Sequence, residues 1–482
     1  MTKQPKSAQP RSAPPDVADL GPQPTRAQSI AAGKAARERA PLQSHAELSV
    51  DPSRDPVGLV LGQDETRVPE LVPVRHGRML VSPFTFYRGA ALPMAADLAR
   101  TMSSGLRVQL CGDAHLANFG AFGSPERRLV FDLNDFDETL PGPFEWDVKR
   151  LVASMVVAGR DNGLSAKRCR SAALATAAAY RNTMGEFAGM SLLDVWYSHF
   201  DVEDAITRLK SSLPKKTVRG TKAQVKKAYT RDNIQMVEKL TTIVDGQRRI
   251  LSDPPLIVPI EELAGELDVD GVYGFIRGII NEYASTLPPD RASVVHRFTL
   301  SRVARKVVGV GSVGTQAWIA LMEPDDELDP LFLQAKQASR SVLADYLGDS
   351  DYDNQGQRVV VGQRFMQAAS DIFLGWTRAA LPGRPVNDYY LRQLRDWKYS
   401  VPIERLDAAS LAAYGQMCGW TLARAHARTG DRIAIATYLG SSDKFDQAVA
   451  DFAQTYADLT ERDHAALAQA VASGRAEALS GV

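Results

Sequence analysis

The sequence predicts an α+β protein made of two lobes, a large helical one and a small β-rich one. Residues 144–200 carry apolar residues at helical spacing, and residues 411–478 return to a helical pattern rich in Ala and Leu. Between them, from Phe298, β-branched residues and glycine predominate, as in strands and tight turns. A chain of 482 residues is long enough for about two to four domains, or for two lobes that share one core.

Composition excludes several classes of protein. The 57 Lys and Arg residues balance 57 Asp and Glu residues, which argues against a dedicated nucleic-acid binder or a binder of anionic membranes. No apolar run approaches the roughly 18 residues of a membrane span, and the segment MTKQPKSAQPRSAPP lacks the apolar core of a secretory signal. The three cysteines form no CxxC pair, so neither a disulfide framework nor a thiolate zinc site is predicted. We expect a cytoplasmic protein without a membrane or nucleic-acid partner.

Four regions follow from the changes in pattern along the chain. The first 24 residues contain six prolines, and no aromatic residue precedes Phe84, so we expect disorder over 1–28 and a disordered or weakly ordered tail over 1–50. A short surface helix at 31–39 would end before Pro41. We assign 51–297 to the helical lobe, 298–400 to the β-rich lobe, and 401–482 to C-terminal helices that pack on the helical lobe.

Within the helical lobe, the pattern places a short strand and a hairpin beside a group of acidic residues. A helix over 91–102 is broken by SSG, and a strand over 107–110 follows. The segments FGAF and LVFDLND then read as two strands joined by a turn at GSPERR. Helix follows from Phe144 to about 200, interrupted at Asn162 and Gly163, with Ser165 as the next N-cap.

The segment from Arg208 to Arg231 contains nine Lys or Arg residues and no Asp or Glu. Two readings remain open. The segment is either a solvated helix pair or mobile loop, or a lid or docking surface for a phosphorylated or acidic substrate.

The strongest chemical motif is CGDAHLANFG at 111–120, followed by FDLNDFDET at 131–139. Asp113 and Asn118 have the spacing D-x-x-x-x-N, and the hairpin brings the chain back to Asp135. Phosphoryl transfer from ATP needs such a set, because a carboxylate orients the acceptor hydroxyl while an amide oxygen and a second carboxylate hold Mg²⁺. We therefore expect Asp113 to be the catalytic base, and Asn118 and Asp135 to be metal ligands. The structural alternative is that Asp113 only caps a turn.

Further charged residues crowd the same segment. Asp132, Asp137 and Glu138 lie within a few residues of Asp135, and such like charges repel one another unless a cation lies among them. This favours a metal site and leaves open whether Asp135 or Asp137 is the ligand. His115 has no second histidine at metal-ligand spacing, so a hydrogen-bonded loop histidine is favoured over a zinc ligand or a base.

The second motif is the glycine-rich run VGVGSVGT at 308–315, which includes Gly309, Gly311, Ser312 and Gly314. The following QAWIALM continues as a strand, so we expect a hairpin tip lying over phosphates rather than the start of a dinucleotide-binding helix. Lys336 lies about 22 residues later in LFLQAKQA, a short apolar strand entering a helix, where its ammonium would hold the α- and β-phosphates. Taken alone, Lys336 would be read as a surface lysine.

These motifs carry a family resemblance. The runs SPFTFYRG, CGDAHLANFG, NDFDETLPGPFEWDVKRL, GVGSVGT, RQLRDWK and CGWTLARAHARTGD resemble the bacterial domain of unknown function 2252 family, from about Asp51 to the C-terminus. The GD-x-H-x-x-N and DFD arrangement is also similar to the aminoglycoside-phosphotransferase branch of the protein-kinase-like superfamily. The resemblance implies a two-lobed kinase-like fold and phosphorylation that depends on ATP and Mg²⁺. It matches Asp113 to the catalytic aspartate, and Asn118 and Asp135 to the metal-binding pair.

Two departures from that pattern matter. The glycine loop and Lys336 follow Asp113 instead of preceding it, so the order is circularly permuted if the assignment holds. No glutamate partner for Lys336 is evident. Asp345 or a more distant carboxylate could serve, or the lysine is unpaired. Either LARAHA at 422–427 or AADLARTM at 95–102 could be the helix that precedes the catalytic loop. For Arg88 and Arg150 a structural ion pair is favoured over contact with phosphate.

Three functions are therefore compared. The first is an ATP-dependent phosphotransferase acting on an unknown hydroxyl acceptor, either a small molecule or a protein. The second is a pseudokinase-like module that binds nucleotide without turnover. The third is a metal-dependent phosphoesterase, since GDAH also opens two-metal phosphatase sites, although no GNH-type segment follows here.

Overall fold

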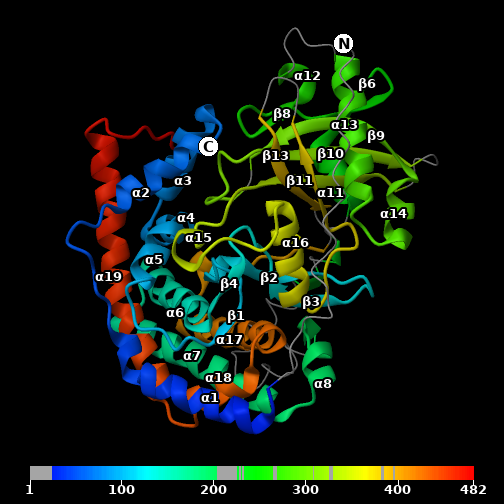
Figure 1. Ribbon diagram of the computed structural model, residues 1–482. Coiled ribbons are helices and arrows are strands. Elements are labelled where there is room, and N and C mark those ends of the chain that lie inside the picture. The colour runs from blue at the N-terminus through cyan, green and yellow to red at the C-terminus, as the bar shows by residue number, and fades with distance from the viewer. Residues whose placement is uncertain are drawn as a thin grey trace, which may run out of the picture.

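The computed structural model describes residues 24–203, 225–226, 229–230, 233–263, 269–307, 309–324, 329–380, 385–394 and 397–481. It confirms the predicted α+β class. One lobe is mainly helical, and the second lobe is built around a six-stranded sheet (Figure 1).

Two central helices organise the helical lobe. Helix α6 (Phe144–Asp161) is buried over nearly its whole length, and its buried residues include charged side chains such as Asp147 and Arg150 as well as apolar ones. Helix α7 (Ala166–Gly189) and the C-terminal helices α17 (Ala408–Thr429) and α19 (Lys444–Ala472) pack against it. The other helices of this lobe are α1 (Arg26–Arg39), α2 (Pro56–Gly62), α3 (Val72–Met79), α4 (Pro83–Gly89), α5 (Ala91–Leu98), α8 (Leu192–Tyr197) and α18 (Arg432–Leu439).

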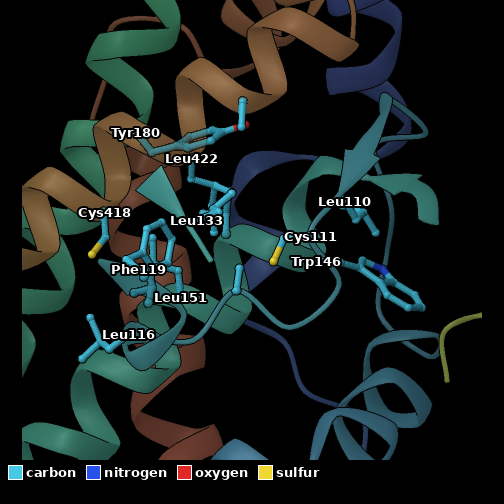
Figure 2. Packing of buried hydrophobic residues seen from close by; sticks show 14 of the residues in the cluster. Leu110, Cys111, Leu116, Phe119, Leu133, Trp146, Leu151, Tyr180, Cys418 and Leu422 are labelled. Carbon is cyan, nitrogen blue, oxygen red and sulfur yellow. The ribbon is translucent and has the colours of Figure 1, made fainter. Parts of the chain in front are cut away.

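Two small sheets lie beside these helices. Strand β1 (Arg107–Leu110) pairs with β4 (Leu140–Pro143), and β3 (Leu129–Leu133) pairs with both β2 (Phe119–Gly123) and β5 (Phe200–Asp201). The antiparallel register Phe119↔Leu133 confirms the predicted hairpin. Figure 2 shows Leu110, Cys111 and Leu116 packed in the core on either side of Asp113, so burial of the flanking residues fixes this polar loop.

The second lobe contains an antiparallel sheet in the order β12-β13-β11-β10-β9-β8. Helix α13 packs on one face with Leu331 and Leu333, whereas α11 packs on the other face with Phe332. Because strand side chains alternate, Lys336 lies on the same face as Phe332. The strands are β8 (Ile257–Pro259), β9 (Phe298–Lys306), β10 (Ala317–Pro324), β11 (Leu331–Ala338), β12 (Gly375–Ala379) and β13 (Asn387–Gln393), with β6 (Thr241–Val244) and β7 (Gln247–Ile250) forming a separate hairpin. The helices of this lobe are α11 (Asn233–Leu240), α12 (Ile260–Leu263), α13 (Val269–Ala284) and α14 (Pro289–Val295). Helices α15 (Ala344–Leu347) and α16 (Gln355–Met366) lie between β11 and β12 in the chain, and their buried residues Ala344 and Val360 pack in the core of the helical lobe.

Two expected boundaries differ from the structure. The sheet lobe includes α11, β8 and α13, so it begins near residue 233 instead of 298. The N-terminal tail is also shorter than expected, because α1 begins at Arg26 and packs on α18 through the buried small residues Ser29, Gly33 and Ala36. A β-carbon at Gly33 would lie 2.4 Å from the backbone oxygen of Ala434, which shows how closely the two helices approach.

Most of the basic segment at 208–231 lies outside the described residues, so the choice between its two readings stays open. Within the described parts of the chain, no helix combines the length and apolarity needed to cross a bilayer.

Candidate active site

A cleft of about 530 Å³ lies between the two lobes. Asp113, Asn118, Asp135 and Asp137 line it from the helical lobe. The sheet lobe contributes Gly309, Gly311, Ser312 and Lys336. Two segments separated by about two hundred residues therefore share one cavity.

A buried aspartate fixes the loop that carries Asp113. Asp147 on α6 accepts the backbone N–H of Cys111 at 2.7 Å and of Gly112 at 3.0 Å, and Nε2 of His426 lies 3.3 Å from the same carboxylate. Gly112 has φ +86°, a conformation that favours glycine. Sequence reasoning missed Asp147, although it lies in the quoted run FEWDVKRL, because its role depends on a contact between helix and loop.

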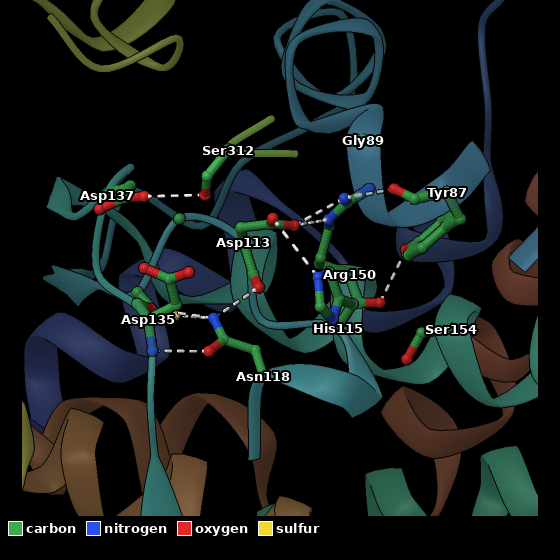
Figure 3. A network of polar contacts seen from close by, with 12 residues as sticks. Tyr87, Gly89, Asp113, His115, Asn118, Asp135, Asp137, Arg150, Ser154 and Ser312 are labelled. Carbon is green, nitrogen blue, oxygen red and sulfur yellow. Dashed lines mark hydrogen bonds and ion pairs between the residues drawn. The ribbon is translucent and has the colours of Figure 1, made fainter. Parts of the chain in front are cut away.

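The carboxylate of Asp113 is held on one side. Arg150 Nη2 lies 2.6 Å from Oδ1 of Asp113 and also donates to the backbone oxygen of Tyr87 at 2.7 Å (Figure 3). This confirms the expected ion pair for Arg150. His115 Nε2 lies 3.5 Å from Oδ2, and burial lowers the pKa of His115 to about 4, so the imidazole is neutral near pH 7. Both contacts of Arg150 with the carboxylate are therefore made to Oδ1 of Asp113, and Oδ2 faces His115.

Asn118 ties the two acidic segments together. Its Nδ2 donates to the backbone oxygens of Asp113 at 3.0 Å and Asp135 at 2.9 Å, and its Oδ1 accepts the N–H of Asp135 at 2.7 Å. These partners fix the orientation of the amide. A metal ion at Asn118 would use the second lone pair of Oδ1.

Lys336 faces the two carboxylates of the DFD segment. Its Nζ lies 3.4 Å from both oxygens of Asp135 and 3.5 Å from Oδ2 of Asp137. Burial opposes ionisation of Asp135, but the positive charges of Lys336, Arg392 and Lys398 outweigh it and lower the pKa of Asp135. Burial and the nearby charge of Asp135 raise the pKa of Asp137. The pKa values of the two carboxylates are thus shifted in opposite directions.

Of the carboxylates considered as partners of Lys336, Asp345 is wrong. Asp345 instead forms an ion pair with Arg340. Helix α16 contributes Arg358, which donates to the backbone oxygen of Asp137 at 2.8 Å. The distant carboxylates that serve Lys336 are those of the DFD segment itself.

Glu138 is a further acidic group in the cleft. Its Oε2 accepts the N–H of Val342 at 2.7 Å, and burial raises the pKa of Glu138 to about 7 against the effect of that bond. Sequence reasoning noted Glu138 only as one of several crowded charges.

The glycine loop joins β9 and β10 as the expected hairpin tip. Ser312 Oγ donates to Asp137 at 3.3 Å, and Arg78 donates to the backbone oxygen of Gly309 at 2.7 Å. Gly314 is placed differently from the expectation. It does not line the cleft but accepts the N–H of Val68 at 2.7 Å, with φ +91°.

Both helices considered for the position before the Asp113 loop are present in the structure. Helix α5 precedes β1 in the chain, whereas α17 ends beside β1, where Thr429 Oγ1 accepts the N–H of Gln109 at 3.2 Å. Only α17 also contributes His426 to the Asp147 contact.

Fold and cleft define an α+β protein of two lobes, with charged residues from both lobes facing one cavity. The chain belongs to the family of uncharacterised proteins conserved in bacteria, DUF2252, whose model matches residues 67–470. The matched range includes Asp113, the glycine loop and Lys336. A search of curated proteins and a search of solved structures each gave no match.

Proposed function

We propose that this protein is a phosphotransferase that depends on ATP and Mg²⁺ and acts on a hydroxyl acceptor. The observation that carries the proposal is the contact of Lys336 with Asp135 and Asp137 across the cleft, at 3.4 and 3.5 Å. It brings together the cation that would hold phosphates and the carboxylates that would hold a metal. The finer proposal is a kinase-like fold in permuted order.

The order of the loop and strands in the sheet lobe supports this proposal. The glycine loop joins β9 and β10, and Lys336 lies on the next strand, β11. Protein kinases likewise place a glycine-rich loop before a lysine on the third strand. The backbone N–H groups of Gly311, Ser312 and Gly314 donate to no acceptor within the described residues, so those of Gly311 and Ser312, which line the cleft, are available to an anion.

The net charge of the cleft also fits a polyphosphate. Seven Lys or Arg side chains line it against four Asp or Glu side chains. This excess of positive side chains around Asp135 and Asp137 suits a nucleotide that keeps a net negative charge when its metal ion is bound.

The donor set fits magnesium. In the described residues no three His, Cys, Asp or Glu side chains form a metal site by themselves. Magnesium is usually held by one or two carboxylates together with substrate phosphates and water, which Asp135 and Asp137 could provide. When bound, the ion would neutralise charge on the transferred phosphoryl group.

The residues of the chain then have distinct tasks. Oδ2 of Asp113 would accept the proton of the acceptor hydroxyl, while Arg150 keeps the carboxylate in place. Lys336 would leave its present carboxylate partners in part to bind phosphate oxygens. Gly311 and Ser312 would contact the phosphates from the glycine loop.

The test combines binding with turnover. Thermal shift with MgATP measures binding, and a coupled assay measures ATP consumption. We expect Lys336→Met to weaken MgATP binding by roughly tenfold to a hundredfold, the worth of a charged hydrogen bond. Asp113→Asn should keep binding and lose turnover. Lys167→Met, an exposed lysine on α7, is the matched control and should change neither.

One observation favours the second candidate, a nucleotide-binding module without turnover. The Oδ1 atom of Asn118 already accepts the N–H of Asp135 at 2.7 Å, which reduces its capacity as a metal ligand. MgATP binding without ATP consumption would support this candidate. Hydrolysis of a generic phosphoester with Mn²⁺ and without ATP would instead support a phosphoesterase.

A further inference from the structure

The helical lobe holds the glycine loop by the backbone oxygens of the loop. Arg78 on α3 donates to the oxygen of Gly309 at 2.7 Å, and the guanidinium of Arg67, which precedes α3, donates to the oxygen of Val313. Because the loop joins two strands of the sheet lobe, β9 and β10, these bonds run from one lobe to the other. The loop is therefore not a free hairpin tip.

Two valines of the loop are buried against the same lobe. Val313 has no exposed surface and lies in an apolar cluster with residues from the segment that leads into α3, namely Val68, Leu71 and Val74. Val310 is 8% exposed and lies in a second cluster with residues of α2, α3, α4 and α19, among them Val60, Met79, Phe86 and Leu467. The N–H of Val68 also donates to the oxygen of Gly314 at 2.7 Å. Apolar packing and hydrogen bonds thus attach the loop at both of its ends.

The attachment leaves backbone donors for the cleft. Gly311 and Ser312 line the cleft, and their N–H groups donate to no acceptor within the described residues. On each side of them the helical lobe takes up backbone oxygens, and Gly309 and Gly314 allow the turns with φ +68° and +91°. The tip of the loop therefore offers donors to an anion before a ligand is present.

The tip also approaches α4 closely. A β-carbon at Gly311 would lie 3.1 Å from the backbone oxygen of Arg88. The ion pair favoured for Arg88 is not formed: its buried Nε has no hydrogen-bond partner, and none of the ion pairs of the described residues includes its side chain. Arg88 thus meets the loop through its backbone, and α4 limits the movement of the tip on this side.

We infer that Arg67, Arg78 and the two valines are positioning residues, which hold the glycine loop in its phosphate-binding conformation before any nucleotide binds. The inference rests on the proposed phosphotransferase function, because the ligand of the loop is the phosphate chain of ATP. A loop that is already fixed loses little conformational freedom on binding, so less of the binding energy is spent on ordering it. The helical lobe therefore contributes to phosphate binding through a loop that belongs to the other lobe.

Hydrogen exchange of the nucleotide-free protein tests the attachment. Within the loop, the N–H of Val313 donates to the oxygen of Val310 at 3.3 Å, and the N–H of Thr315 donates to the oxygen of Ser312 at 3.2 Å. If the helical lobe holds the loop, these two bonds persist and the amides of residues 313 and 315 exchange slowly in the wild type.

Two variants loosen the attachment, each with a matched control. Val313→Ala and Arg78→Met should speed exchange in residues 309–316 roughly tenfold or more, whereas Arg78→Lys, which keeps a donor, should have a smaller effect. Val303→Ala removes the same two methyl groups from a valine that is 4% exposed in the core of the sheet lobe. Arg100→Met removes a half-exposed arginine that pairs with Asp51 outside the cleft. Neither control should change exchange in the loop.

Calorimetric titration with a non-hydrolysable ATP analogue and Mg²⁺ tests the role in binding. Val313→Ala and Arg78→Met should weaken binding roughly tenfold, because only a fraction of the loosened protein has the loop in place. Arg78→Lys should lie between Arg78→Met and the wild type. Adenosine has no phosphates, so it should bind to these variants as it binds to the wild type, and a general disturbance of the cleft would weaken both ligands.

The outcomes are distinguishable. Unchanged exchange in Val313→Ala and Arg78→Met would overturn the attachment. Faster exchange with unchanged or tighter binding of the analogue, or with equal weakening of adenosine, would overturn the positioning role. If the wild type does not bind the analogue, the proposed function fails, and the exchange data still decide whether the helical lobe holds the loop. The thermal unfolding midpoint shows whether each variant is folded, and Arg78→Lys keeps the test valid if Val313→Ala is not.

Discussion

Gly112 and Gly163 form a matched pair for testing how the loop before Asp113 is held. Both have positive φ, +86° and +72°. A β-carbon at Gly112 would lie 2.3 Å from the backbone oxygen of Glu138, whereas nothing lies within 4 Å of one at Gly163. Alanine at either position therefore pays the same conformational cost, and only the first also meets a backbone atom.

The expected magnitudes follow from these distances. Left-handed backbone costs alanine about 1–2 kcal/mol, which is the whole effect expected for Gly163→Ala. Gly112→Ala must also displace the Glu138 backbone, and overpacking of this kind costs about 1–3 kcal/mol more. Since Glu138 follows Asp137, the shift should also disturb the carboxylates that face Lys336.

Urea unfolding followed by circular dichroism measures both variants, with the midpoint of the helical-lobe transition as the readout. Gly112→Ala should lower this midpoint clearly more than Gly163→Ala. Equal shifts would refute the argument that close contact with Glu138 holds the loop. The cost of positive φ would then account for the whole effect at both positions.

Three further predictions follow from buried charges and the cleft. Arg424→Met should destabilise the helical lobe by about 3–5 kcal/mol, because it leaves Asp132, its 2.6 Å partner, charged and buried; adding Asp132→Asn should recover part of the loss in a urea titration. Burial, with the charge of Lys149, lowers the pKa of His45 to about 3, so the unfolded chain binds this proton more readily below pH 6.5. The free energy of unfolding should therefore be independent of His45 protonation above about pH 6.5 and should fall below it, by up to about 1.4 kcal/mol per pH unit. His45→Asn should reduce this pH dependence in unfolding curves measured between pH 5 and 7. Ser312→Ala removes a 3.3 Å bond to Asp137 while leaving the loop backbone intact, so a MgATP thermal shift within about threefold of the wild-type affinity is expected, and a complete loss would contradict a cradle made mainly of backbone N–H groups.

Local pattern predicted the elements near the site well. The hairpin from Phe119 to Leu133 and the strands on both sides of the glycine loop could be read from alternation and turn residues. The family, too, could be identified from a set of short motif runs, of which CGDAHLANFG is one. These features depend on residues close together in the sequence.

Assignments that depend on tertiary contact could not be read in the same way. The periodicity of α13 predicts a helix but does not say that it covers the sheet. Helix α1 packs through Gly33 and Ala36, which lack the large apolar side chains that mark a buried face. The partner of Lys336 and the role of Asp147 likewise depend on contacts between segments far apart in the chain.

The site is supported by residues from both halves of the polypeptide. Arg424 and His426, on α17, contact Asp132 and Asp147 beside the acidic loops. A ribosome therefore makes the loop of Asp113 some three hundred residues before the helix that secures it. Nascent chains stopped before α17 should have the acidic loops but not their native support, so the last part of the protein to emerge completes the part made early.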